Sequence, residues 1–232
     1  MRVLAIETST LAGGAALLDG DQLVGEYILN VRTTHSERLL SAADRLLQDA
    51  GWTLGVLEGL AVAVGPGSFT GLRIGVSSVK GLAFSLKIPV AAVSTLEALA
   101  WALPFARDPV CPVLDARKGE VYVALFHWDG ESLIRDWEDQ ALDPEELCRR
   151  LSGPVTFVGD GIAKYGSLFK ELLGPLATFA PPARRLPSAA CVGQLGHARL
   201  LAGEVVDPVA LTPRYLRPSE AELKLRRGFA LR

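Results

Sequence analysis

The chain has 232 residues, of which 49% are hydrophobic and 22% are charged, a balance typical of one large or two small globular domains. Its net charge of −2 argues against binding nucleic acid by charge alone, and its longest uncharged stretch, 59–72, is too short to span a membrane. Three separated cysteines without a C-x-x-C pair and three separated histidines argue against a disulfide framework or a zinc centre, and they indicate a reducing cytoplasm.

The first part of the chain predicts a meander of strands followed by alternating helices and strands. Asp19-Gly20 is a hairpin turn signal, and Thr34 and Glu37 have the spacing of a capping box before the first helix. The expected strands are 2–7, 12–18, 22–29, 60–64 and 90–93, and the expected helices are 35–50, 70–86 and 95–103.

From residue 110 the same order of elements begins again. The expected strands are 110–115, 120–128, 132–137, 155–158 and 176–179, and the expected helices are 144–151, 162–173 and 188–201. A repeat of about 100 residues indicates duplicated α/β lobes rather than a solenoid. We therefore expect an α/β fold of two lobes, each a mixed five-stranded sheet with helices, with a cleft between them. The expected division is a lobe at 1–105, a lobe at 106–206 and a basic tail at 207–232 that packs back on a lobe.

Polar residues end the first strand of each lobe. Glu7, Thr8 and Ser9 end the first strand of the N-terminal lobe, and Asp115 ends the corresponding strand of the second lobe. Carboxylates at such strand ends are candidates for holding the Mg²⁺ and phosphates of a nucleotide, whereas hydroxyls there also cap turns. The sequence therefore leaves open weak binding of ATP or ADP with Mg²⁺ at these residues.

The Gly65-Pro66-Gly67-Ser68 loop lies between a strand and a helix. No Gly-Lys-Ser/Thr follows, so the loop is not a Walker A motif, and the spacing to Gly71 excludes a nucleophile elbow at Ser68. Close packing of the strand, turn and helix is the favoured interpretation, with anion binding at the helix N-terminus as the alternative.

The helix expected at 70–86 carries only two charges after Gly71, those of Arg73 and Lys80. Gly71, Gly75 and Ser78 share one side and are small enough for a second helix to approach closely. Such a helix is either buried between the sheet and the preceding helix or exposed at a protein interface.

Three segments carry a resemblance to a known family: 6–10 (IETST), 64–75 (VGPGSFTGLRIG) and 213–217 (PRYLR). With these segments the whole chain resembles the TsaB (YeaZ) family, which serves tRNA threonylcarbamoyladenosine formation. That family belongs to the actin/hexokinase/Hsp70-like ATPase superfamily.

The resemblance implies a cytoplasmic, non-catalytic subunit that needs no cofactor and no membrane. It implies a heterodimer with TsaD through helices of the N-terminal lobe, TsaE as a third partner, and a homodimer in isolation. The complex would transfer threonylcarbamoyl to N6 of adenosine 37 in tRNAs that read ANN codons, with tRNA contact by this chain indirect or weak. The residues expected at the partner interface are Leu39, Ala43, Leu46, Gly71, Ile74, Gly75, Ser78 and Leu82.

Thr95 and Leu99 occupy the positions of a His-x-x-x-His metal motif in TsaD, and neither residue replaces a histidine ligand. The resemblance therefore implies no metal site here. The main alternative is a small Mg²⁺-dependent ATPase or kinase that uses Glu7 and Asp115. A peptidase, the older description of the wider family, is disfavoured because no Ser/His/Asp constellation is identifiable.

Overall fold

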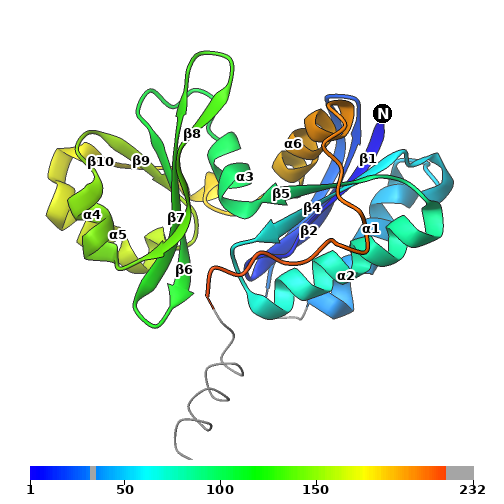
Figure 1. Ribbon diagram of the computed structural model, residues 1–232, viewed down its shortest axis with the longest axis horizontal. Helices are drawn as coiled ribbons and strands as arrows, with labels where there is room; N and C mark the ends of the chain where they lie inside the picture. The colour runs from blue at the N-terminus through cyan, green and yellow to red at the C-terminus, as the bar shows by residue number, and fades with distance from the viewer. Residues whose placement is uncertain (32–34, 218–232) are drawn as a thin grey trace, which may run out of the picture.

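The computed structural model describes residues 1–31 and 35–217, which form two lobes, each built on a five-stranded sheet (Figure 1). The predicted order of elements is confirmed in both halves. The strands are β1 (Arg2–Glu7), β2 (Ala12–Asp19), β3 (Gln22–Asn30), β4 (Gly59–Gly65), β5 (Val90–Ser94), β6 (Val110–Arg117), β7 (Glu120–Trp128), β8 (Leu133–Leu142), β9 (Val155–Val158) and β10 (Ala177–Phe179). The helices are α1 (His35–Asp49), α2 (Phe69–Leu86), α3 (Thr95–Trp101), α4 (Pro144–Arg150), α5 (Ile162–Leu173) and α6 (Ala189–Leu201), with short 3-10 turns at Leu54–Val56, Gly174–Leu176 and Pro182–Arg184. The capping box predicted at Thr34 and the basic residues after 217 lie outside the described residues.

The first sheet has the order β3-β2-β1-β4-β5, with β1 antiparallel to β2 and parallel to β4. Side chains of β1 alternate between two cores because successive residues of a strand point to opposite faces. Leu4 and Ile6 pack in the cluster that contains residues of α1 and α2, whereas Val3 and Ala5 pack in the cluster that contains residues of α6. Both faces of β1 are therefore covered, which explains why this central strand reads as an almost continuous apolar run.

Helix α6 lies on the first sheet, and our expectation that it belongs with the second lobe was wrong. The sheet face beneath it is lined by small side chains such as Ala5, so the helix must approach closely to exclude voids. A Cβ atom at Gly193 would lie 2.1 Å from Leu18 Cδ1 and 3.1 Å from Ala5 Cβ. The absence of a side chain at Gly193 thus permits this packing. The proposed division after residue 105 stays a prediction.

The second sheet has the order β10-β9-β6-β7-β8. One of its faces packs against α4 and α5, in a core that includes Phe157 and Phe169, with ring centroids 4.6 Å apart. The other face packs against Leu96 and Leu99 of α3, a helix from the first half of the chain. Each sheet is thus covered by one helix from the other half of the chain, and α3 joins the lobes by an apolar contact (Figure 1).

Strand β8 is longer than the 132–137 segment that we expected. Its additional residues continue the antiparallel pairing with β7, where Val121 pairs with Leu142 and Val123 with Gln140. The prediction ended too early because Glu138 and Asp139 make this segment resemble an exposed loop. Asp139 is in fact buried.

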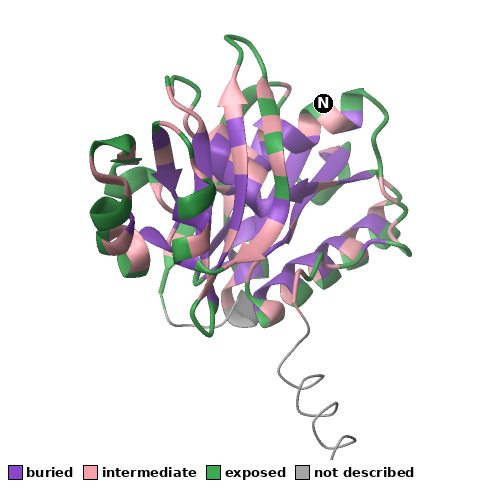
Figure 2. Ribbon diagram, turned by 60° about the vertical axis from the view of Figure 1, so that its left-hand side comes forward, coloured by how far each residue is buried: buried purple, intermediate pink, exposed green. Residues whose placement is uncertain are grey.

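Burial follows the layers of the fold, with buried residues in the sheets and exposed residues on the outward faces of the helices and in the loops (Figure 2). Among the described residues, no helix is long and apolar enough to cross a membrane. After α6 the chain returns along the first lobe, and residues 207–217 reach the second lobe.

Candidate functional site

The turn after β1 packs against the start of α2. Thr8 Oγ1 donates to the carbonyl oxygen of Gly71 at 2.8 Å, and the Ser68 amide donates to the Ser9 carbonyl oxygen at 2.6 Å. Glu7, Thr8 and Ser9 are all buried, with at most 1% of each residue exposed. Their contacts hold the Gly65–Ser68 loop against β1, which agrees with the packing interpretation of that loop.

The Glu7 carboxyl group is buried without a basic partner among the contacts of the described residues. Its Oε1 accepts a hydrogen bond from the Ser9 amide at 2.5 Å, and its Oε2 has no hydrogen-bond partner there. Burial raises the pKa of Glu7 to about 7, although hydrogen bonds from Ser9 and from the Thr8 backbone partly oppose this shift. The group is therefore largely neutral in weakly acidic solution.

This raised pKa predicts a pH-dependent stability. Between about pH 4.5 and 7 the folded protein keeps a proton on Glu7 that the unfolded chain has released, so stability falls as the pH rises through this window. We expect Glu7→Gln to raise the free energy of unfolding at pH 8 by roughly 3 kcal/mol and to leave it unchanged at pH 4. Urea unfolding at pH 4, 6 and 8 measures this, with the exposed Glu204→Gln as control. If Glu7→Gln changes the free energy of unfolding by the same amount at all three pH values, the raised pKa of Glu7 is contradicted.

Asp115 lies in a different environment from Glu7. Its side chain is 18% exposed, its Oδ1 accepts from Lys164 Nζ at 3.2 Å, and Arg117 lies 3.7 Å from its Oδ2. The Asp115 amide donates to Asp160 Oδ1, and burial raises the pKa of Asp160. Within the described residues the partners of Asp115 belong to the second lobe and those of Glu7 to the first. No contact among the described residues brings the two candidate carboxylates together, so their role in nucleotide binding stays a prediction.

Helices α1 and α2 pack side by side on the first sheet, and they contain the eight residues expected at a partner interface. The structure divides these residues into two groups. Leu39, Ala43, Gly71 and Gly75 are buried, whereas Leu46, Ile74, Ser78 and Leu82 are partly exposed. Only the second group is accessible to a partner without disruption of the core.

In the row formed by Gly71, Gly75 and Ser78, Gly75 faces β1 and not the partner helix that we expected, and Gly71 is buried as well. A Cβ atom at Gly75 would lie 2.3 Å from Thr8 Oγ1 and 3.4 Å from Ile6 Cγ2. The small residues thus serve the close approach of α2 to its own sheet.

A second row of small residues occupies the outward side of α2. Ser77, Gly81 and Ser85 are exposed, and a Cβ atom at Gly81 would meet no atom within 4 Å. Large apolar side chains are exposed on the same helix pair, since Phe84 of α2 and Leu40 of α1 are each 56% exposed. This surface combines small and apolar side chains, as protein interfaces do.

A cluster of charged residues at the junction of the lobes was missed by the sequence analysis. We call it the junction cluster: Ser94, Glu97, Arg135, Asp139, Arg199 and Arg214. Arg199 Nη2 donates to both carboxylate oxygens of Glu97, at 2.6 and 2.7 Å. Arg135 Nη1 donates to Asp139 Oδ1 at 2.6 Å. Because the residues come from β5, α3, β8, α6 and the C-terminal segment, no local spacing in the sequence could reveal the cluster.

All members of the junction cluster except Asp139 line a polar cavity of about 200 Å³, together with Val64, Ala92 and Glu138. Within the cluster the three guanidinium groups are offset by Glu97, Asp139 and the nearby Glu138. The arginines beside this cavity are therefore engaged by carboxylates of the chain itself.

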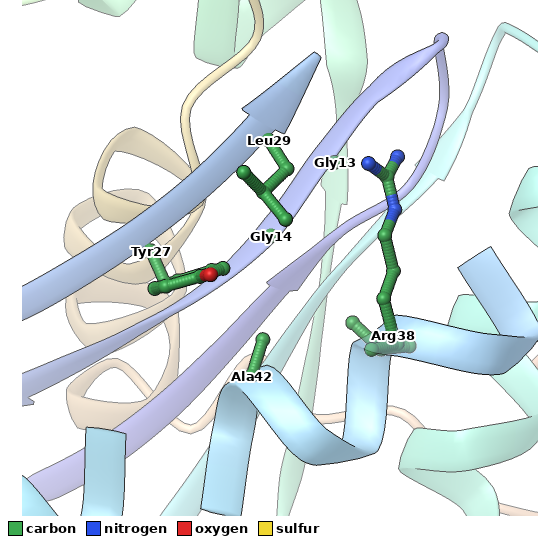
Figure 3. A pocket seen from close by; sticks show the side chains of 7 residues that line it. Gly13, Gly14, Tyr27, Leu29, Arg38 and Ala42 are labelled. Carbon is green, nitrogen blue, oxygen red and sulfur yellow. The ribbon is translucent and has the colours of Figure 1, made fainter. Parts of the chain in front are cut away.

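A much smaller cavity lies between α1 and the β2–β3 hairpin (Figure 3). Its volume is about 10 Å³, close to the minimum for one water molecule. The Arg38 side chain extends from α1 along β2, and its Nη2 donates to the Leu11 carbonyl oxygen at 2.8 Å. This cavity is too small for a cofactor.

Thr95 and Leu99, which occupy the positions of the TsaD metal motif, are both fully buried in α3. Among the described residues, no group of three or more His, Cys, Asp or Glu side chains is arranged to hold a metal ion.

Comparisons with known proteins cover both lobes. The family model of TsaD, the tRNA N6-adenosine threonylcarbamoyltransferase, matches residues 29–225. The chain is 36% identical to the tRNA threonylcarbamoyladenosine biosynthesis protein TsaB of Bacillus subtilis (strain 168), over 97% of both chains. It is 34% identical to TsaB of Escherichia coli (strain K12), over 97% of this chain and 98% of that one.

A solved structure, YeaZ from Pseudomonas aeruginosa, matches with a TM-score of 0.78 and 28% identity, over 93% of this chain and 99% of that chain. The two mixed sheets in this arrangement are those of the duplicated actin-like ATPase fold, as predicted. With the full-length identity to the curated relatives, the chain belongs to the TsaB family of tRNA threonylcarbamoyladenosine biosynthesis proteins.

Proposed function

We propose that this chain is a cytoplasmic, non-catalytic subunit that pairs with a TsaD-type transferase through the outward surface of α1 and α2. The observation that carries the proposal is the row formed by Ser77, Gly81 and Ser85, which leaves room for a partner helix close to α2. The half-buried Leu46, Ile74 and Leu82 and the exposed Phe84 supply apolar area beside it.

The kind of partner is argued from the relationship of the two families. The TsaD model matches residues 29–225, a range that includes α1 and α2, so a TsaD protein has a corresponding helix pair. Two related surfaces can meet about a pseudo-twofold axis, and two copies of this chain can meet in the same way. We therefore propose the heterodimer as the working assembly and a homodimer through the same face in isolation.

In this proposal the chain supports threonylcarbamoyl transfer to adenosine 37 of ANN-reading tRNAs without a cofactor of its own. TsaE would join the assembly, and any tRNA contact of this chain would be indirect or weak. The buried position of Glu7 supports this view, because a carboxyl group that is 1% exposed does not reach a nucleotide phosphate without rearrangement of the turn.

Gly81→Arg tests the interface because it puts a long charged side chain on the outward face of α2, where the isolated subunit has open space. We expect the affinity for purified TsaD of the same organism, measured by calorimetry, to fall about thirtyfold or more, the effect of a hot-spot residue. Gly153→Arg, also in open space but in the second lobe, is the matched control and should bind like wild type. Unchanged binding by the Gly81 variant would show that this face of α2 is not the interface.

The non-catalytic role is tested separately by omission. In a mixture of tRNA, ATP, threonine, bicarbonate and the other pathway enzymes, modified adenosine should form only when this chain is added. The isolated chain should turn over no ATP, and Asp115→Ala should support product formation like wild type. Asp115-dependent ATP turnover by the isolated chain would instead favour the small ATPase or kinase.

A further inference from the structure

Residues 207–217 run along the first lobe before they reach the second. Lys80 Nζ of α2 donates to the carbonyl oxygens of Val209 and Leu211, at 3.1 and 3.2 Å. The Leu211 side chain is only 2% exposed and belongs to the core cluster beneath α1 and α2. This segment is therefore a packed part of the first lobe.

The next residues attach the segment to the end of β4 and the start of α2. The Arg214 amide donates to the Val64 carbonyl oxygen at 2.7 Å. The Tyr215 ring stacks on Phe69 with centroids 3.7 Å apart and ring planes at 3°, and the Tyr215 hydroxyl accepts from Arg73 Nε at 3.0 Å. Backbone and side-chain contacts thus fix the position of residues 214 and 215.

Two arginines of the same segment hold the second lobe. Arg214 Nη1 donates to Asp139 Oδ2 of β8 at 3.2 Å. Arg217 Nη1 donates to the carbonyl oxygens of Ala116 and Arg117 and forms a 2.5 Å ion pair with Glu120. Within four residues the chain therefore contacts both lobes, on β4 and α2 on one side and on β6, β7 and β8 on the other.

Asp139 is a buried carboxylate that accepts hydrogen bonds from both lobes and from the C-terminal segment. Its side chain is fully buried, and besides Arg214 it accepts from Ser94 Oγ at 2.8 Å and from Arg135 Nη1 at 2.6 Å. A buried carboxylate is tolerated only while its partners stay in place. Ser94 belongs to the first lobe and Arg214 to the C-terminal segment, so a rotation of the lobes would remove two of the three partners together.

We propose that residues 207–217 are an interlobe strap that holds the two lobes in one orientation, with Asp139 as its anchor on the second lobe. Relative motion is the default for two lobes of one chain unless the interface between them is large and apolar. The strap opposes that motion, so α2 and the second lobe move as one body. This proposal does not depend on the identity of the partner that α2 binds.

Distance measurement between two spin labels tests the strap on the full chain. Ser41→Cys on α1 and Ser167→Cys on α5 provide exposed labelling sites in the two lobes. The half-buried Cys191 is replaced by Ala, while Cys111 and Cys148 are buried and stay unlabelled. The labelled chain is diluted with an excess of unlabelled chain, so that a homodimer contributes no distances between its two copies. We expect one narrow distance distribution for the otherwise unchanged protein, and at least a twofold broader one after Arg214→Ala and Arg217→Ala are combined.

Two controls separate a strap from a general loss of structure. Arg45→Ala removes an arginine whose ion pair with Asp49 lies within α1, so its distribution should stay narrow. Arg214→Lys in the otherwise unchanged chain keeps a positive charge near Asp139. The width of its distance distribution should therefore be closer to that of wild type than the width for Arg214→Ala. A narrow, wild-type distribution in the folded double variant would overturn the proposal and assign the fixed orientation to the α3 contact alone.

Hydrogen exchange keeps the proposal testable if the double variant does not fold. Arg217→Ala alone removes the contacts with the carbonyl oxygens of Ala116 and Arg117 and with Glu120, and it leaves the contacts of Arg214 in place. If the strap acts as one unit, the Arg214 amide, which donates to Val64, should exchange about tenfold faster or more in this variant. An unchanged rate at the Arg214 amide, together with an unchanged rate in Arg45→Ala, would show that the segment is not one unit and would overturn the proposal.

Discussion

Gly75→Arg is expected to yield no stable native protein. The new side chain would start 2.3 Å from Thr8 Oγ1, in a position where α2 packs directly on β1. Even one added methyl group in a filled core costs about 1–3 kcal/mol. A buried guanidinium group without a partner adds to this cost, and together the two effects approach the 5–15 kcal/mol that typically stabilises a domain. Size-exclusion chromatography and urea unfolding followed by circular dichroism measure the loss.

Gly81→Arg in the same helix is the matched comparison. No atom lies within 4 Å of the Cβ position there, and arginine favours helix more than glycine does. We expect the fold to be retained and the free energy of unfolding to rise by up to about 1 kcal/mol. Equal unfolding midpoints for the two variants would contradict the described contact between α2 and β1.

Asp139→Ala should destabilise the protein by about 3–5 kcal/mol, the usual cost of removing one partner from a buried ionic group. The substitution leaves Arg135 and Arg214 close together without the carboxylate that lies between them. Ser94 also loses the acceptor of its hydroxyl hydrogen bond. Urea unfolding at pH 7 measures the change.

Glu146→Ala provides a surface control for this prediction. Glu146 also contacts two arginines, Arg149 and Arg150, but these pairs lie in solvent on α4. Exposed ion pairs contribute little to stability, so the unfolding midpoint should stay close to that of wild type. Equal losses in the two variants would show that Asp139 is not a buried anchor.

The local elements of this fold were predictable because their causes are local. Apolar periodicity and turn residues placed β7, β9 and α5 at their observed bounds, and the two repeated halves predicted two mixed sheets. Which helix covers which sheet face was not predictable in this way. The sequence did contain one indication of the helix that covers the first sheet. The alanine-lined face of that sheet requires a helix with small residues, such as Gly193 of α6.

The interface residues show the same limit. The sequence established that α2 is rich in small and apolar residues, but a helix with apolar residues on most sides has no unique buried face. The position of Thr8 beneath Gly75 decided that this glycine faces the sheet and that Gly81 faces outward.

By itself, then, the sequence determined the order of the strands and helices, the duplicated α/β lobes and, through its motifs, the TsaB family. These features depend on neighbouring residues, whose spacing can be read along the chain. Only the tertiary structure showed that α3 packs on the second sheet and α6 on the first, which face of α2 points outward, and that Asp139 is buried. Each of these depends on contacts between segments far apart in the chain, such as the 75 residues between Asp139 and Arg214.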